Sequence, residues 1–241
     1  MLPDVPLIKR ALPIPTGGEN PVKRRRYEMG LRKVLIERTR ARILDATRAI
    51  LAAPGDLDSF TMAAVAKRAG VSRMTLFNQF KSEEGLVEAL SDRLAMAGGL
   101  SNPRSSFVVD DPAVALANFI RVFARFWDHD RRVMRRLRAM GVLTPSVGRK
   151  SRNRDSWRTN HIEVLLERFH LPRANPVRGH RQETVDLLTA LTSFEMFDAL
   201  CTSQRPPDEV AELLTRVALN HLGIGGSRVR RGPPSRLSQA R

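Results

Sequence analysis

Five side chains between residues 73 and 79 are of the types that read the edges of DNA bases. Asn78 and Gln79 carry amides that can pair with adenine, and Arg73 carries a fork of donors that suits guanine or a phosphate. Met74 and Thr75 can pack on a thymine methyl group. Met74 and Asn78 are four residues apart, so a helix would place both on one face. The pattern predicts that this face enters the major groove, and it leaves open which residue reads a base.

Residues 61–80 must position that face, and they read as two short helices joined by a tight turn. Gly70 ends the first helix, because the left-handed backbone needed there favours glycine. Thr61 and Ser72 are N-caps, since their hydroxyls can accept N–H groups from a first helical turn. Ala66 is small enough for the two helices to cross closely. The spacing predicts a DNA-binding helix-turn-helix, and the alternative is an ordinary helical hairpin in a core.

This motif and its flanks resemble the N-terminal region of the tetracycline-repressor (TetR) family. The resemblance rests on Ile43, Ala46, Gly55, Phe60, Thr61, Ala66, Ala69, Gly70, Val71, Ser72, Thr75, Leu76, Phe80 and Leu86. It implies an all-α homodimer, in which each subunit has a three-helix DNA-binding head and a larger helical body for dimerisation and for binding a small-molecule effector. It also implies a transcriptional regulator, more commonly a repressor, that binds a palindromic double-stranded DNA operator and responds to an unidentified ligand.

Three residues depart from the family pattern. Met74 stands where the family often has a small residue that lets the backbone approach DNA. Phe77 replaces the usual tyrosine, so the resemblance implies that one hydrogen bond to a phosphate is missing. Glu83 replaces a lysine that binds phosphate, and Lys81 is expected to take over that contact. With Thr61 and Ser72, the residues Phe77 and Lys81 complete the predicted DNA-binding surface of the head.

The composition agrees with a nucleic-acid partner. The chain has 41 Lys and Arg against 25 Asp and Glu, a formal net charge of +16, and most of the basic residues are arginine. Guanidinium groups suit phosphate and guanine, but they also form ordinary ion pairs. Charge alone therefore leaves a second interpretation, a nonspecific nucleoid-type protein that binds nucleic acid through arginine-rich tails.

The sequence shows no sign of catalysis. Its five histidines have no metal-ligand spacing, and it has neither a nucleophile motif nor a phosphate-binding loop. We therefore expect no enzymatic activity, no cofactor and no metal. The single cysteine, Cys201, is expected to be a small buried residue rather than a redox sensor. No apolar run is long enough to span a membrane, and the sequence predicts a cytoplasmic protein.

Composition divides the chain into four parts. Residues 1–30 are predicted to be a disordered basic arm, which contains Lys23, Arg24, Arg25 and Arg26. These four residues either contact phosphates or the minor groove beside the head, or they belong to a solvated tail. Residues 31–98 are the predicted helix-turn-helix domain, residues 106–223 the effector-binding and dimerisation domain, and residues 224–241 a disordered basic tail.

Helical periodicity runs through the predicted body, and no strand is evident. Helices are expected at residues 82–97, from Pro112 onward, and at 131–140, 150–169, 179–202 and 207–222. The last two helices have dense apolar faces. The resemblance implies that they pack against their copies in a four-helix dimer interface, and the alternative is an ordinary internal core.

An effector pocket is expected only because of the resemblance. Its candidate lining is the set of large apolar residues of the body, which comprises Phe119, Phe123, Phe126, Trp127, Met140, Trp157, Phe169 and Phe194. Each of these is also an ordinary core candidate. Three arginine-rich runs between residues 131 and 154 suit either an anionic ligand or ion pairs on the surface, and the sequence names no ligand.

Overall fold

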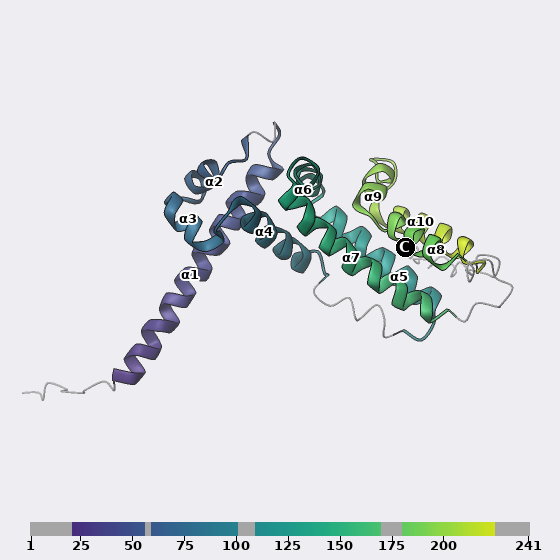
Figure 1. The fold of residues 1–241 in the computed structure, drawn as a ribbon, viewed down its shortest axis with the longest axis horizontal. Helices are drawn as coiled ribbons and strands as arrows, with labels where there is room; N and C mark the ends of the chain where they lie inside the picture. The colour runs from purple at the N-terminus through teal and green to yellow at the C-terminus, as the bar shows by residue number, and fades with distance from the viewer. Residues whose placement is uncertain (1–20, 56–58, 101–108, 170–179, 225–241) are drawn as a thin grey trace, which may run out of the picture. The chain divides into compact units, whose positions relative to one another are not determined.

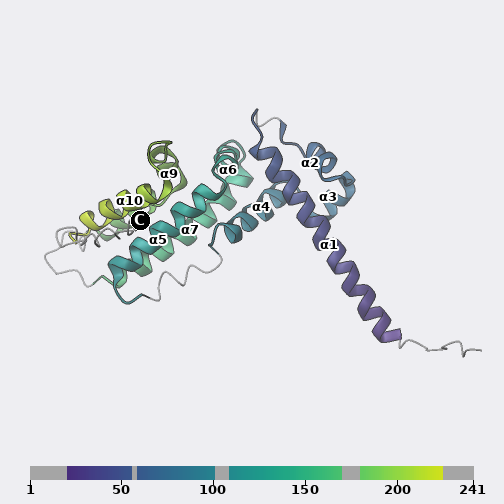
Figure 2. The same cartoon turned by 180° about the vertical axis from the view of Figure 1, so that it is seen from behind.

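In the computed structural model the described residues are 21–55, 59–100, 109–169 and 180–224. They form helices and no strand, which confirms the predicted all-α class (Figures 1 and 2). The chain divides into two compact units, residues 1–42 and 43–241. The predicted tail from residue 225 and the first 20 residues of the predicted arm lie outside the described part of the chain.

The first unit is described from residue 21, where helix α1 (Pro21–Ala52) begins. The sequence predicted disorder as far as residue 30, and the structure differs because residues 21–30 are helical. Proline is favoured in the first turn of a helix, and the arginines and lysine that follow it form helices readily. The arm and the first helix are therefore continuous over this stretch.

The second unit opens with the end of α1 and three further helices, α2 (Met62–Ala69), α3 (Arg73–Phe80) and α4 (Glu83–Ala97). The predicted caps are formed. Thr61 Oγ1 accepts the N–H of Ala64 at 3.1 Å, and Ser72 Oγ accepts the N–H of Thr75 at 3.0 Å. Gly70 has φ +62°, and its N–H donates to the carbonyl of Ala66 at the end of α2. These local bonds fix the angle at which α3 leaves the turn.

In the head, the apolar core lies between α2, α3 and α4. Leu76 and Phe80 point inward from α3, as their spacing predicted, and Val65 and Ala66 meet them from α2. All four side chains are buried, and Leu86 of α4 is fully buried with them. Because the inward face of α3 is held by this core, its opposite face is left for solvent or a partner.

The body contains α5 (Pro112–His129), α6 (Arg131–Leu143), α7 (Pro145–Glu167), α8 (Arg181–Leu191), α9 (Phe194–Leu200) and α10 (Pro207–His221). Asp111 caps α5 with Pro112 in the first helical position, as the sequence predicted. Helices α6 and α7 pack closely, and α10 lies along α5 (Figure 1). Helix α7 begins at Pro145, five residues before the predicted start, because proline fits a first turn.

One predicted helix is broken in two. Residues 179–202 were expected to be continuous, but α8 ends at Leu191 and α9 begins at Phe194. Ser193 caps the new helix by accepting the N–H of Met196 at 3.2 Å. The indole Nε1 of Trp127 donates to the carbonyl of Thr192 at 3.0 Å, so the break also satisfies a buried donor.

The apolar faces of the last helices are largely covered within one chain. Val185 and Leu188 of α8 and Val210 and Leu214 of α10 are buried, and α10 packs on α5. The internal-core alternative therefore accounts for much of the apolar surface that the resemblance assigned to a dimer interface. Val217 of α10 remains 39% exposed. Dimerisation stays a proposal for this protein.

Candidate DNA-binding and effector sites

Helix α3 presents most of the predicted base-reading residues on its outward face. Arg73, Met74 and Asn78 are exposed, with Met74 at 66%. Thr75 and Gln79 are half-buried at the edges of this face. One guanidinium, one thioether, one hydroxyl and two amides thus stand together on a helix whose other side is anchored in the core. Such a face can present hydrogen-bond donors, acceptors and apolar contacts to the floor of a groove.

The N-terminus of α3 is organised by its cap. Ser72 Oγ lies 2.9 Å from Thr75 Oγ1, in addition to accepting the Thr75 N–H. Thr61 is likewise exposed and occupied as the cap of α2. Both hydroxyls therefore have a structural task, and any phosphate contact that they make would be additional to it.

Two more of the predicted DNA-binding residues, Phe77 and Lys81, lie at the C-terminal end of α3. Phe77 is 53% exposed, so its ring lies at the surface without a hydroxyl. Lys81 is exposed and, with φ +65°, is the one non-glycine residue of the described chain that has a positive φ. Its N–H donates to the carbonyl of Phe77 at 2.7 Å, which closes α3 before Ser82 caps α4.

The remaining predicted DNA contacts, Lys23, Arg24, Arg25 and Arg26, lie on the helical backbone of α1. Their side chains lie outside what the structure describes.

A cavity of about 240 Å³ lies between α4 and the first three helices of the body. Its lining comprises Glu84, Val87, Glu88, Ser91, Ala95, Leu100, Phe123, Phe126, Trp127, Met134, Leu137, Arg138, Val147, Ser151, Asp155, Trp157 and Arg158. Four of the predicted residues, Phe123, Phe126, Trp127 and Trp157, are brought together here. The cavity therefore borders a helix of the head as well as helices of the body.

The other four predicted residues do not line this cavity. Phe119, Met140, Phe169 and Phe194 are all buried, each at 8% exposure or less, and they belong to the core around it. Phe194 still contributes indirectly, because its ring centroid lies 5.6 Å from that of Trp127 in an edge-on arrangement. These four residues are core residues that support the lining.

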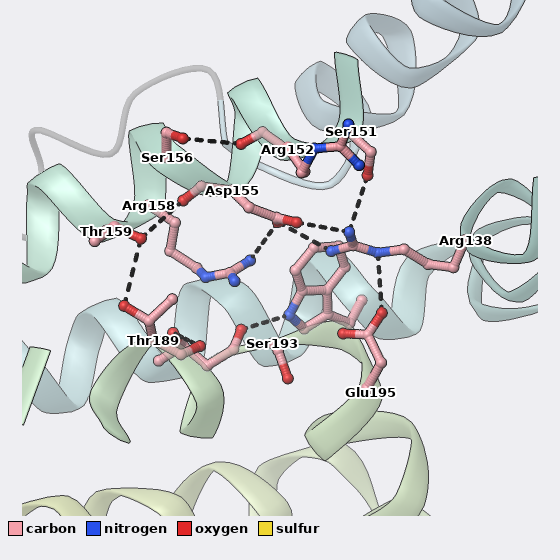
Figure 3. Close-up of polar contacts among 12 residues, drawn as sticks. Arg138, Ser151, Arg152, Asp155, Ser156, Arg158, Thr159, Thr189, Ser193 and Glu195 are labelled. Atoms are coloured by element: carbon pink, nitrogen blue, oxygen red, sulfur yellow. Dashed lines mark hydrogen bonds and ion pairs between the residues drawn. The ribbon is translucent and has the colours of Figure 1, made fainter. Parts of the chain in front are cut away.

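The polar side of the cavity was not among the predicted lining residues. Arg138 of α6 donates through Nη1 and Nη2 to the two carboxylate oxygens of Asp155 on α7, at 2.8 and 3.1 Å. Arg158 donates through Nη1 to the same carboxylate at 2.9 Å, and Ser151 Oγ accepts from Arg138 at 2.9 Å (Figure 3). We call Arg138, Asp155 and Arg158 the buried charge cluster. The sequence held two signals of this cluster, the arginine-rich run that contains Arg138 and the i, i+3 spacing of Asp155 and Arg158.

Burial and pairing act against each other in this cluster. Burial raises the pKa of Asp155, but hydrogen bonds and charges from Arg138 and Arg158 outweigh it, so the net pKa is lowered. Burial lowers the pKa of Arg158, and the neighbouring Arg138 charge lowers it further against the pull of Asp155. The two guanidiniums thus compete for one carboxylate.

Aromatic rings form the apolar side of the cavity. The centroid of Phe123 lies 5.9 Å from Trp127 and 6.5 Å from Trp157, with the rings tilted. The guanidinium carbon of Arg138 lies 5.4 Å from the Trp127 ring centroid, and that of Arg158 lies 5.8 Å from Phe123. These distances are those of cation–π contacts, so the charge cluster and the aromatic wall form one surface.

Three other arginines of these runs have different partners. Arg131 and Arg135 both pair with Asp198, at 2.5 and 2.8 Å. Arg136 donates to the carbonyls of Ile50 and Gly55. Of the arginine runs named in the sequence, Arg138 alone among the described side chains lines the cavity.

Polar contacts also join the helix-turn-helix head to the body. Arg48 of α1 donates through Nε and Nη2 to the carboxylate of Asp130, which precedes α6, with distances of 2.7 to 3.0 Å. Ser146 of α7 donates to Glu84 of α4 at 2.9 Å. A change in the cavity that moved α6 or α7 would therefore reach α1 and α4 directly.

In residues 21–55, 59–100, 109–169 and 180–224, no group of His, Cys, Asp and Glu is placed to hold a metal ion. Within the same residues no helix is long and apolar enough to cross a membrane. Cys201 is buried, and burial raises the pKa of its thiol.

The geometry agrees with three comparisons. Residues 43–90 match the model of the bacterial regulatory proteins of the tetR family. The regulator AlkX of Mycobacterium tuberculosis is 38% identical over 81 residues, which cover 34% of this chain and 36% of AlkX. The repressor KstR of Mycolicibacterium smegmatis is 41% identical over 81 residues, which cover 29% of this chain and 39% of KstR. The chain thus matches little more than a third of the length of either curated relative.

A solved structure extends the likeness to the body, at the level of the fold. A transcriptional regulator from Rhodococcus sp. Rha1 superposes with a TM-score of 0.59 at 19% identity. The superposition covers 76% of this chain and 95% of that one. The arrangement of a helix-turn-helix head and a helical body is therefore shared beyond the 43–90 segment.

Proposed function

Because residues 43–90 belong to the TetR family of bacterial regulators, we propose that this protein is a ligand-responsive transcriptional repressor that binds a palindromic operator as a homodimer. The observation that carries the proposal is the outward face of α3, which exposes Arg73, Met74 and Asn78 while Leu76 and Phe80 anchor its other side. A dimer would place two such helices in successive major grooves and occlude transcription.

The cavity supports the ligand-responsive part of the proposal. Helix α4 lines it and also belongs to the head, and Glu84 is both a lining residue and the acceptor of Ser146. A ligand that favours one position of α4 relative to α6 and α7 would change the separation of the two α3 helices in a dimer. The free energy of operator binding would then weaken by at most the difference in ligand-binding free energy between the two positions of α4.

The test is selection of binding sites from a random duplex library, followed by affinity measurements on the winning and scrambled sequences at several salt concentrations. We expect a two-fold symmetric winner that binds well above background. Equal affinity for all sequences with a steep salt dependence would instead support the nonspecific, arginine-driven alternative. An asymmetric winner bound by a monomer would contradict the dimer.

Phe77→Tyr should tighten operator binding by about 1 kcal/mol, the value of one hydrogen bond to a phosphate. The ring is 53% exposed near the end of α3, so the added hydroxyl meets solvent rather than the core. The measurement is the dissociation constant for the selected operator, with Phe60→Tyr as a control, because Phe60 is buried in the head. An unchanged affinity in Phe77→Tyr would show that no phosphate lies within reach.

Asp130→Asn should lower the free energy of unfolding by about 1–2 kcal/mol, because it removes the charge from a bidentate pair. The Asp130 carboxylate is 9% exposed, whereas its partner Arg48 is 48% exposed and can rehydrate. The matched control is Asp45→Asn, which breaks the exposed pair with Arg93 and should cost less than about 0.5 kcal/mol. Urea denaturation of the three proteins decides between them, and equal midpoints would argue against a link at Asp130.

A further inference from the structure

Arg158 is a buried cation whose hydrogen-bonding capacity is only partly used. Its side chain is 4% exposed and lines the cavity from α7. Nη1 donates to Asp155, but in the described chain Nε is buried without a hydrogen-bond partner, and Nη2 makes no hydrogen bond either (Figure 3). A buried charge with unused donors is costly, and structures usually supply the missing acceptor.

Among the described residues, Asp155 is the one carboxylate that accepts a hydrogen bond from Arg158. Asp155 already accepts from both terminal nitrogens of Arg138, so one carboxylate serves two guanidiniums. The acids whose charges act on Arg158 are Asp155 and Glu195, and the Glu195 side chain is 63% exposed and lies 3.4 Å from Arg138 instead. Glu84 and Glu88 also line the cavity, from α4.

The space beside this cation suits a flat apolar group. The Phe123 and Trp127 ring centroids lie 5.8 and 6.0 Å from the guanidinium carbon, and Phe126 and Trp157 complete the wall. A dry protein cavity of about 150 Å³ can hold benzene. The volume of about 240 Å³ therefore has room for a ring together with an acidic group.

We propose that the effector is a small aromatic carboxylate, of one or two rings, whose carboxylate accepts from the donors that Arg158 does not give to Asp155. The rings would lie against Phe123, Phe126, Trp127 and Trp157. The inference rests on the proposed function only for its consequence, the release of DNA. Binding itself depends only on the cavity.

Binding is tested with benzoate and 2-naphthoate on the full chain, with benzamide and 2-naphthamide as neutral controls of the same shape. Quenching of tryptophan fluorescence reports occupancy, since two of the lining residues are tryptophans. We expect at least one acid to bind about 10-fold or more tightly than its amide, as a charge-assisted hydrogen bond predicts. Equal affinities of acid and amide, or no binding of either acid at about 1 mM, would overturn the inference.

Variants separate the role of Arg158 from a loss of folding. Arg158→Gln should weaken binding of the acid about 10- to 100-fold and leave amide binding little changed, and Arg158→Lys should restore part of it. Circular dichroism checks that both variants fold. If they do not, the comparison of acid with amide on the unaltered protein still tests the inference. Equal acid binding by folded Arg158→Gln would overturn the assignment.

DNA binding is measured separately in the presence of the acid. An acid that binds through Arg158 without releasing the selected operator would support the ligand class and contradict the proposed regulatory function. Specific operator binding that persists while no acid binds would support the proposed DNA recognition and contradict the ligand class.

Discussion

Gly85→Ala should destabilise the DNA-binding head by about 3 kcal/mol or more, at the upper end of what overpacking costs. A Cβ at this position of α4 would lie well under 3.0 Å from the carbonyl oxygen of Phe80 and 3.3 Å from its carbonyl carbon. Both are backbone atoms, so no side chain can turn aside. Phe80 is itself 5% exposed, and the turn at Lys81 follows it directly. Relief would require α3 and α4 to move apart.

Thermal and urea unfolding of Gly85→Ala give the measurement, with operator binding as the functional readout. Gly70→Ala is the matched control, because it places a methyl group in open space and suffers only from φ +62°. It should cost about 1–2 kcal/mol. If Gly85→Ala unfolded at the same urea concentration as the unaltered protein, the predicted clash between a Cβ at residue 85 and the Phe80 carbonyl would be contradicted.

The helix-turn-helix was predictable because its determinants are local. The cap hydroxyls of Thr61 and Ser72 each bond an N–H three residues away, and Gly70 closes α2 on the carbonyl of Ala66. Such contacts depend on spacing along the chain, which a single sequence displays. The inward positions of Leu76 and Phe80 follow from the same helical period.

The cavity was only half predictable, because helical period identifies inward residues but not where space remains between helices. Phe119 and Phe123 lie on one face of α5 with centroids 4.8 Å apart, yet only Phe123 lines the cavity. Arg138 and Asp155 meet only because α6 packs against α7, and no spacing along the chain brings them together. The apolar wall could therefore be guessed from composition, whereas its polar partner required the fold.

Tertiary packing also decided the two clearest differences from expectation. The single helix expected at residues 179–202 is broken at the point where the indole N–H of Trp127 donates to the carbonyl of Thr192, a contact between distant segments. The resemblance assigned the apolar face of α10 to a dimer interface, with an internal core as the alternative, and α5 covers much of that face within one chain. In both cases the missing information was the identity of the packing partner.

Asp155→Asn should lower the free energy of unfolding by about 3–5 kcal/mol at neutral pH, because it leaves two largely buried guanidiniums without their shared counter-charge. The side chains of Arg138 and Arg158 are 18% and 4% exposed, so neither can rehydrate without opening the contact of α6 with α7. Asp198→Asn is the comparison, since its partner Arg135 is 53% exposed and can return to water. Its other partner, Arg131, is 22% exposed and keeps its hydrogen bonds to the carbonyls of Asp198 and Cys201. The cost of Asp198→Asn should be clearly smaller.

The pH dependence of the difference between the unaltered protein and Asp155→Asn gives an independent check. The folded-state pKa of Asp155 is lowered despite burial, because Arg138 and Arg158 favour the carboxylate. The stability that the Asp155 carboxylate contributes is therefore fully present above its pKa in the unfolded chain, about 3.9. This stability is lost as the pH falls towards the pKa of Asp155 in the folded protein. The difference in unfolding free energy should be constant near neutral pH and should shrink below about pH 4. The pKa of Asp198 is also lowered, but Asp198 is present in both proteins, so its contribution to the pH dependence cancels in the difference. A difference that grew on acidification would mean that Asp155 is not held as a carboxylate between the two arginines.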